Sequence, residues 1–214
     1  MRNNPLTLAL PGALLLLGLA FANSARAGLI DCSSVTPDIS GKVTPSVGCR
    51  ILEPLDGNDN SSPALINAEA FFGFDDWLLD GKLDDNGTSL VPDAADPATL
   101  VSATGDAQSG TWSLTDAAAF WSDNSDLMFV FKDGDNTNLV GYLIQAGAAG
   151  GSYATPFVDP PFDLNGNSGS RDISHIGIYH RGGGIEVPAP APLALFGIGL
   201  LGLGWSSSRR RAGH

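Results

Sequence analysis

The residues best able to do chemistry in this chain are its histidines, and their spacing argues against a shared site. There are three, of which His214 lies in a basic tail, leaving His175 and His180. Five positions apart on a strand, these two side chains face opposite sides and cannot bind one metal ion. No Gly-x-Ser-x-Gly elbow is present to expose a nucleophilic serine. We therefore expect no enzyme, with His175 packing or hydrogen-bonding on a β-sandwich. A cleft joining His175 to a serine and an acid would instead indicate a hydrolase.

Four acidic turns are the next candidates, because oxygen ligands at alternate positions suit Ca²⁺. They occupy residues 56–60, 84–87, 133–136 and 163–167. None completes the twelve-residue calcium loop, and Asp and Asn are also the usual turn residues. We expect plain turns and no cofactor. Ca²⁺ remains the alternative, with Asp133 and Asp135 as the pair that would hold it.

Aromatic residues and cysteines have two interpretations each. Trp77, Trp112, Trp121 and Tyr179 would form either a platform for sugar rings or part of a hydrophobic core, which is the commoner role of aromatics. Cys32 and Cys49 are the only cysteines. In an exported chain they most simply form a disulfide, and no nearby histidine supports a metal site or a catalytic thiol.

The elements that must position these residues are short and β-prone, with many glycines and prolines between them. Strands are predicted at 46–53, 69–79, 110–114 and 173–181, and a hairpin at 126–132 and 139–145. One short helix is predicted at 115–121. This pattern favours a mainly β fold, an antiparallel β-sandwich of the jelly-roll kind, over residues 28–186.

The body at 28–186 is strongly acidic. It holds all 23 acidic residues and only six of the eleven basic ones, for a formal charge of −17. Such a charge repels nucleic acid and anionic lipid, and it favours solubility outside the cell. Nucleic acid is therefore not an expected partner.

Residues 1–27 have the features of a secretory signal peptide. Arg2 precedes an apolar stretch, and Ala25 and Ala27 form a small-x-small cleavage site that makes Gly28 the first mature residue. The Sec export machinery is the partner that this segment predicts.

Residues 187–214 combine a proline-spaced opening, an apolar run and a basic tail. Val187, Pro188, Ala189 and Pro190 come first, a membrane-spanning helix is predicted at about 191–208, and 209–214 is the tail. Arg209, Arg210 and Arg211 would stop transfer and stay on the cytoplasmic side. The prolines keep the preceding backbone extended and accessible to an enzyme.

This ending resembles the PEP-CTERM sorting signal of Gram-negative surface and exopolysaccharide-associated proteins, with Ala189 where that family usually has glutamate. The resemblance implies a membrane-embedded exosortase as partner, cutting near Pro188–Pro190. It predicts a protein that passes through an inner-membrane-anchored intermediate with a periplasmic body and reaches the cell surface or extracellular matrix. We expect a non-enzymatic role there, with polysaccharide as a candidate partner. The alternative is a carbohydrate- or calcium-binding adhesion module.

Overall fold

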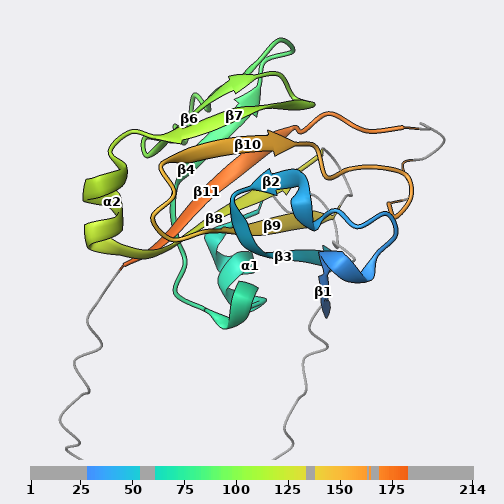
Figure 1. Cartoon of the computed structure of the whole chain (residues 1–214), viewed down its shortest axis with the longest axis horizontal. Helices are drawn as coiled ribbons and strands as arrows, with labels where there is room; N and C mark the ends of the chain where they lie inside the picture. The colour runs from blue at the N-terminus through green and yellow to red at the C-terminus, as the bar shows by residue number, and fades with distance from the viewer. Residues whose placement is uncertain (1–27, 54–60, 134–137, 163, 165–168, 183–214) are drawn as a thin grey trace, which may run out of the picture.

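The computed structural model describes residues 28–53, 61–133, 138–162, 164 and 169–182. Within them, the chain folds into two antiparallel β-sheets that face each other (Figure 1). The predictions of a mainly β fold and of antiparallel pairing are confirmed. The predicted signal peptide, sorting motif and membrane helix lie outside the described residues.

The larger sheet has seven strands in the order β1-β3-β9-β8-β11-β4-β5. Their bounds are β1 (Gly28–Asp31), β3 (Ser46–Glu53), β4 (Leu78–Asp85), β5 (Leu90–Pro92), β8 (Asn124–Lys132), β9 (Leu139–Ile144) and β11 (His175–Gly182). The smaller sheet has the order β2-β10-β7-β6, formed by β2 (Val43–Thr44), β6 (Val101–Gly105), β7 (Ser109–Leu114) and β10 (Gly150–Ala154). The predicted hairpin is present, because β8 and β9 pair in antiparallel register.

The topology differs from the predicted jelly roll. A jelly roll has eight strands in two sheets, whereas the described residues form eleven, divided seven and four. Three pairs that follow each other in sequence, β4–β5, β6–β7 and β8–β9, are hairpins within one sheet. Simple hairpins therefore account for much of this architecture.

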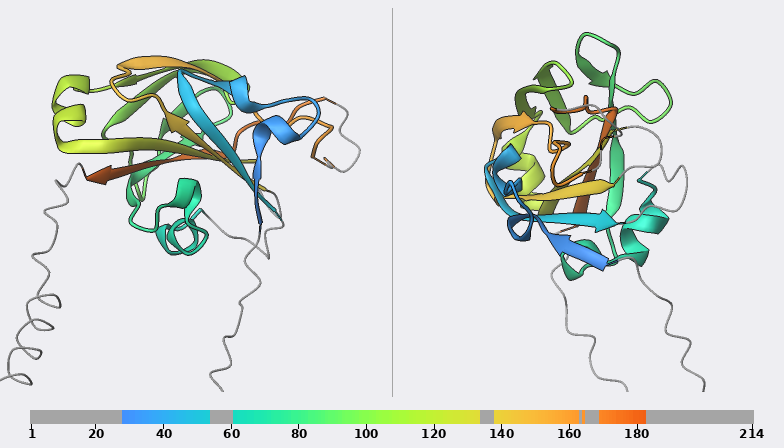
Figure 2. Two further views of the ribbon diagram at one scale, coloured as in Figure 1. Left: turned by 60° about the horizontal axis from the view of Figure 1, so that its bottom comes forward. Right: turned by 90° about the vertical axis from the view of Figure 1, so that its right-hand side faces the viewer.

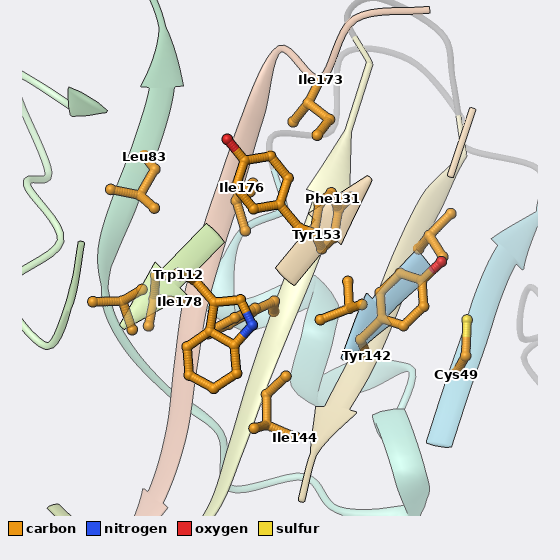
Figure 3. Close-up of a cluster of buried hydrophobic side chains, with 14 of the residues drawn as sticks. Cys49, Leu83, Trp112, Phe131, Tyr142, Ile144, Tyr153, Ile173, Ile176 and Ile178 are labelled. Carbon is orange, nitrogen blue, oxygen red and sulfur yellow. The ribbon is translucent and has the colours of Figure 1, made fainter. Parts of the chain in front are cut away.

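The main core lies between the two sheets. Trp112 of β7 meets Phe129 of β8 edge-on, with 5.0 Å between ring centroids. Figure 3 shows Trp112 and Tyr153 from the small sheet lying over Ile176, Ile178 and other side chains of the large sheet. Period-2 alternation directs these residues inward and leaves their neighbours on the outer faces.

A second core covers the opposite face of the large sheet. Here the predicted strand at 69–79 is wrong: α1 (Pro63–Ala68) and a 3₁₀ turn η3 (Phe71–Gly73) precede β4. Ala70, Phe72 and Gly73 have left-handed φ angles of 51°, 57° and 86°, and three such residues within four positions interrupt a regular strand. This segment lies beneath the large sheet in Figure 2 and packs Phe71 and Trp77 against it.

Two local features fix that cover. Ser62 caps α1 by accepting a hydrogen bond from the Leu65 amide at 3.3 Å, with Pro63 in the first turn. Gly141 of β9 leaves room for the Phe71 ring, since a Cβ there would lie 2.8 Å from two of its atoms. The other helix, α2 (Ala117–Asp123), agrees with the prediction within two residues and is capped by Asp116.

Candidate functional site

A buried serine and histidine lie together where α1 meets the large sheet. His175 opens β11, and Ser61 comes just before the cap of α1. Ser61 Oγ and His175 Nε2 are 3.1 Å apart. Ser61 has a left-handed φ of 41°, and its carbonyl accepts a hydrogen bond from the Tyr179 hydroxyl. The loop before α1 is therefore held to β11 at two points.

Charged groups on both neighbouring strands surround His175. It is opposite Lys132 on β8 and opposite Asp84 on β4. Burial lowers the pKa of His175 to about 4, and the ammonium groups of Lys82 and Lys132 act in the same direction. The imidazole is consequently neutral at physiological pH.

Asp84 has the opposite shift. Burial raises its pKa to about 6, and a hydrogen bond to Asp93 and repulsion from that carboxylate contribute further. Backbone amides of Asp96 and Ala95 and the side chain of Asp84 lower the pKa of Asp93 to about 2. The two carboxyl groups thus share a proton that stays on Asp84 at mildly acidic pH.

Ser61 and His175 are the residue types of a nucleophile and its general base, but a substrate could not reach the serine hydroxyl. A neutral imidazole at hydrogen-bonding distance can accept a hydroxyl proton. The Ser61 side chain, however, is 0% exposed. Its visible role is to anchor α1. His175 is hydrogen-bonded in the β-domain, as predicted, whereas no sequence pattern indicated Ser61 as its partner.

His180 lies on the other face of β11. Its Nδ1 is 2.8 Å from Asn124 Oδ1, and its ring contacts Phe120 of α2. Burial lowers its pKa. The two histidines are therefore on opposite sides of the strand, as their spacing predicts.

The proposed calcium pair is only half within the described residues. Asp133 is buried, and its carboxylate lies 3.6 Å from the Arg171 guanidinium. Asp135 lies outside the described residues. Over the described ranges, no three His, Cys, Asp or Glu side chains gather into a metal-binding group. The positive charge of Arg171 already balances the negative charge of Asp133, so no metal cation is needed for that purpose.

The aromatic residues are mostly core residues. Trp77, Trp112 and Tyr179 are 1%, 4% and 0% exposed. Trp121 is half-buried on α2 and donates a hydrogen bond to the Ala148 carbonyl at 2.8 Å. Trp112 comes from the small sheet, Trp77 and Tyr179 lie in the second core on the other side of the large sheet, and Trp121 is on α2. The four side chains therefore do not form one sugar-binding platform.

The cysteine prediction is confirmed. Cys32 and Cys49 form a disulfide that joins the segment after β1 to the middle of β3. Both residues are buried in the main core. The bond therefore fixes β1 to its neighbour β3.

The end of β11 carries a dense polar cluster that the sequence did not predict. The Arg181 guanidinium stacks 3.6 Å from the Phe74 ring centroid. It also pairs with Asp76 at 2.5 Å and with Asp126 at 2.7 Å. This cluster fixes β11, the last described strand, beside β8 and beside the segment that joins η3 to β4.

The comparisons with known proteins concern the segment that follows this strand. Residues 186–211 match the PEP-CTERM protein-sorting motif. The chain carries a PEP-CTERM sorting signal. No curated protein and no solved structure matches the chain.

The PEP-CTERM motif marks an exported protein that is sorted by an exosortase and passes through a membrane-anchored intermediate. The matched range contains Val187, Pro188, Ala189 and Pro190 together with the arginines 209–211. The alanine variant of the motif is therefore still recognised as a member. Among the described residues, no helix has the length and apolar character to cross a membrane.

Proposed function

We propose that this protein is a non-enzymatic surface or matrix protein, exported through Sec and delivered to the extracellular polysaccharide by PEP-CTERM sorting. The match at residues 186–211 carries the proposal. The acidic body and the disulfide suit an exported domain. The Ser61–His175 pair, found among the described residues, is enclosed, which supports a role without catalysis.

The smaller sheet gives this role a surface. Its four strands contain no charged residue, although the body around them has 29. Their outer face presents exposed hydroxyl groups, many of them paired across strands. The residues are Thr44, Ser102, Thr104, Ser109, Thr111, Ser113 and Ser152.

This hydroxyl face favours a second candidate function, adhesion to neutral carbohydrate. Thr44 and Ser152 lie 2.7 Å apart, and Thr104 and Thr111 lie 2.6 Å apart. The hydroxyls of this face can exchange hydrogen bonds with sugar hydroxyls, and no charged side chain must be desolvated on contact. Buried aromatics make the sugar-stacking form of this function less suitable.

The sorting part is tested by intact mass of the protein in cells with and without the exosortase. A product lacking residues 1–27 and the segment after the proline motif, formed only with the enzyme, is expected. A product that retains Arg209–Arg211 in both strains would refute sorting.

The polysaccharide part is tested by co-sedimentation of the secreted protein with the producing cell's polysaccharide. Thr104→Lys with Thr111→Lys should reduce binding, because two ammonium groups would stand on the neutral face. Asp38→Lys, on an exposed turn outside this face, is the control. Equal loss in both variants, or no loss, would count against the hydroxyl face.

A further inference from the structure

The folded body ends very close to the sorting signal. β11 ends at Gly182, and the PEP-CTERM match begins at residue 186. Four residue steps span at most about 14 Å, and the eight steps to Pro190 span at most about 29 Å, even fully extended. An enzyme that grips several residues of this motif must therefore approach the surface around Gly182.

That surface can be defined from the described residues. Gly182 pairs with Asn124, the residue that follows α2. Figure 1 shows the end of β11 beside α2, and the turned view in Figure 2 agrees. Asp116 and Asp123 at the two ends of α2 line a hollow of about 290 Å³ that also reaches Asn124. We call this surface the exit face.

The exit face is acidic. Asp116 and Asp123 are exposed, and neither has an ion pair among the described residues. Arg181 is nearby, but its guanidinium is occupied by Asp76, Asp126 and the Phe74 ring. Anionic lipid would be repelled by this face, whereas a basic protein surface would be attracted.

We propose that the exit face is a docking surface for the membrane-embedded sorting enzyme, which meets it with basic side chains. The inference rests on the sorting part of the proposed function. The short connection from Gly182 holds the two surfaces together, and the charges of Asp116 and Asp123 orient them. The body then contributes to recognition alongside the proline motif.

The test is a pulse-chase measurement of precursor processing in cells that contain the exosortase, using the full chain. Asp116→Asn with Asp123→Asn removes both charges. Asparagine can keep the helix cap of Asp116 and the acceptor that Asp123 offers to Ser122. We expect processing to slow by about threefold or more, because facing charges act mainly on encounter.

The matched control removes two charges at the opposite end of β11. Asp172 precedes that strand by three residues, and it lines one hollow together with Asp106. Asp106→Asn with Asp172→Asn should leave the processing rate unchanged. Equal rates for the wild type and both double variants would overturn the proposal. Faster processing of the exit-face variant would overturn it in favour of a lipid contact relieved of repulsion.

A flexible spacer distinguishes a loss of docking from a folding defect in the variant. A flexible insertion of roughly fifteen Gly and Ser residues after Gly182 frees the enzyme from the body. In that background, the exit-face variant should be processed at the rate of its parent. If it stays slow, the variant body is defective and docking is refuted. If the unaltered protein is not processed at all, the sorting function itself fails, which is a distinct result.

Discussion

Replacement of His175 by glutamine should change how stability responds to acid. In the folded protein burial lowers the pKa of His175 to about 4, against an ordinary value of 6.5. Between these pH values the unfolded chain binds a proton that the folded chain excludes, so the wild type loses stability as pH falls. The pKa difference corresponds to about 3 kcal/mol once the pH is below 4. Glutamine can still face Ser61 Oγ but does not titrate.

The neighbours of His175 do not obscure this effect, because they are common to both proteins. Asp84, with its pKa raised to about 6, adds stability as pH falls from 6 towards 3.8. Asp93, with its pKa lowered to about 2, loses stability as pH falls below 3.8. Subtracting one protein's unfolding free energy from the other's therefore isolates the histidine.

The measurement is urea unfolding of both proteins, followed by tryptophan fluorescence at several pH values from about 7 to about 4. The advantage of the wild type over His175→Gln should shrink by about 3 kcal/mol across this range. His180→Gln is the comparison. The difference in unfolding free energy between the wild type and this variant should change less with pH, because His180 is less buried than His175. A difference between wild type and His175→Gln that stays constant with pH would refute the buried, neutral imidazole.

Three further predictions concern the fold and the proposed cation. Replacing Cys32 and Cys49 by serine should cost roughly 3 kcal/mol of unfolding free energy, measured by urea unfolding, because the bond closes a loop of 17 residues; an unchanged midpoint would contradict this. Gly141→Ala should cost about 1–3 kcal/mol by crowding the buried Phe71 ring, whereas Gly41→Ala, with open space around it, should change stability little; equal effects would show that β9 yields to the extra methyl. Millimolar Ca²⁺ followed by chelator should leave the melting temperature unchanged, since Arg171 opposes the charge of Asp133; a reversible rise with Ca²⁺ would revive the calcium pair.

Local sequence pattern was sufficient for the four adjacent inner strands of the large sheet, β3, β9, β8 and β11. β3 has the predicted bounds, and β8, β9 and β11 differ by about two residues at most. Their alternating or continuous apolar residues face one core or two, and turn residues bound them. The same local argument identified the disulfide, because two cysteines in an exported chain leave one pairing.

Local pattern failed where a long-range contact decides the conformation. Residues 69–79 hold several aromatics and resemble a strand by propensity. In the fold, the Asn67 side chain accepts a hydrogen bond from the Trp77 backbone amide at 2.8 Å and donates one to the Trp77 carbonyl at 3.0 Å. These two bonds close a loop over the sheet. The loop fits because Gly141, about seventy positions away in the sequence, has no side chain to collide with the Phe71 ring. The sequence around Phe71 alone therefore does not explain this conformation.

The candidate surfaces show the same division between local and long-range information. The sorting signal is one continuous stretch, so its order of proline, apolar and basic residues is complete in the sequence. The hydroxyl face is assembled from residues as distant as Thr44 and Ser152, 108 positions apart. Each of its strands alone is an ordinary short Ser/Thr segment. Only the strand order β2-β10-β7-β6 brings them together as one uncharged surface on an acidic body. The destination of this protein can therefore be predicted from its sequence more readily than its binding partner there.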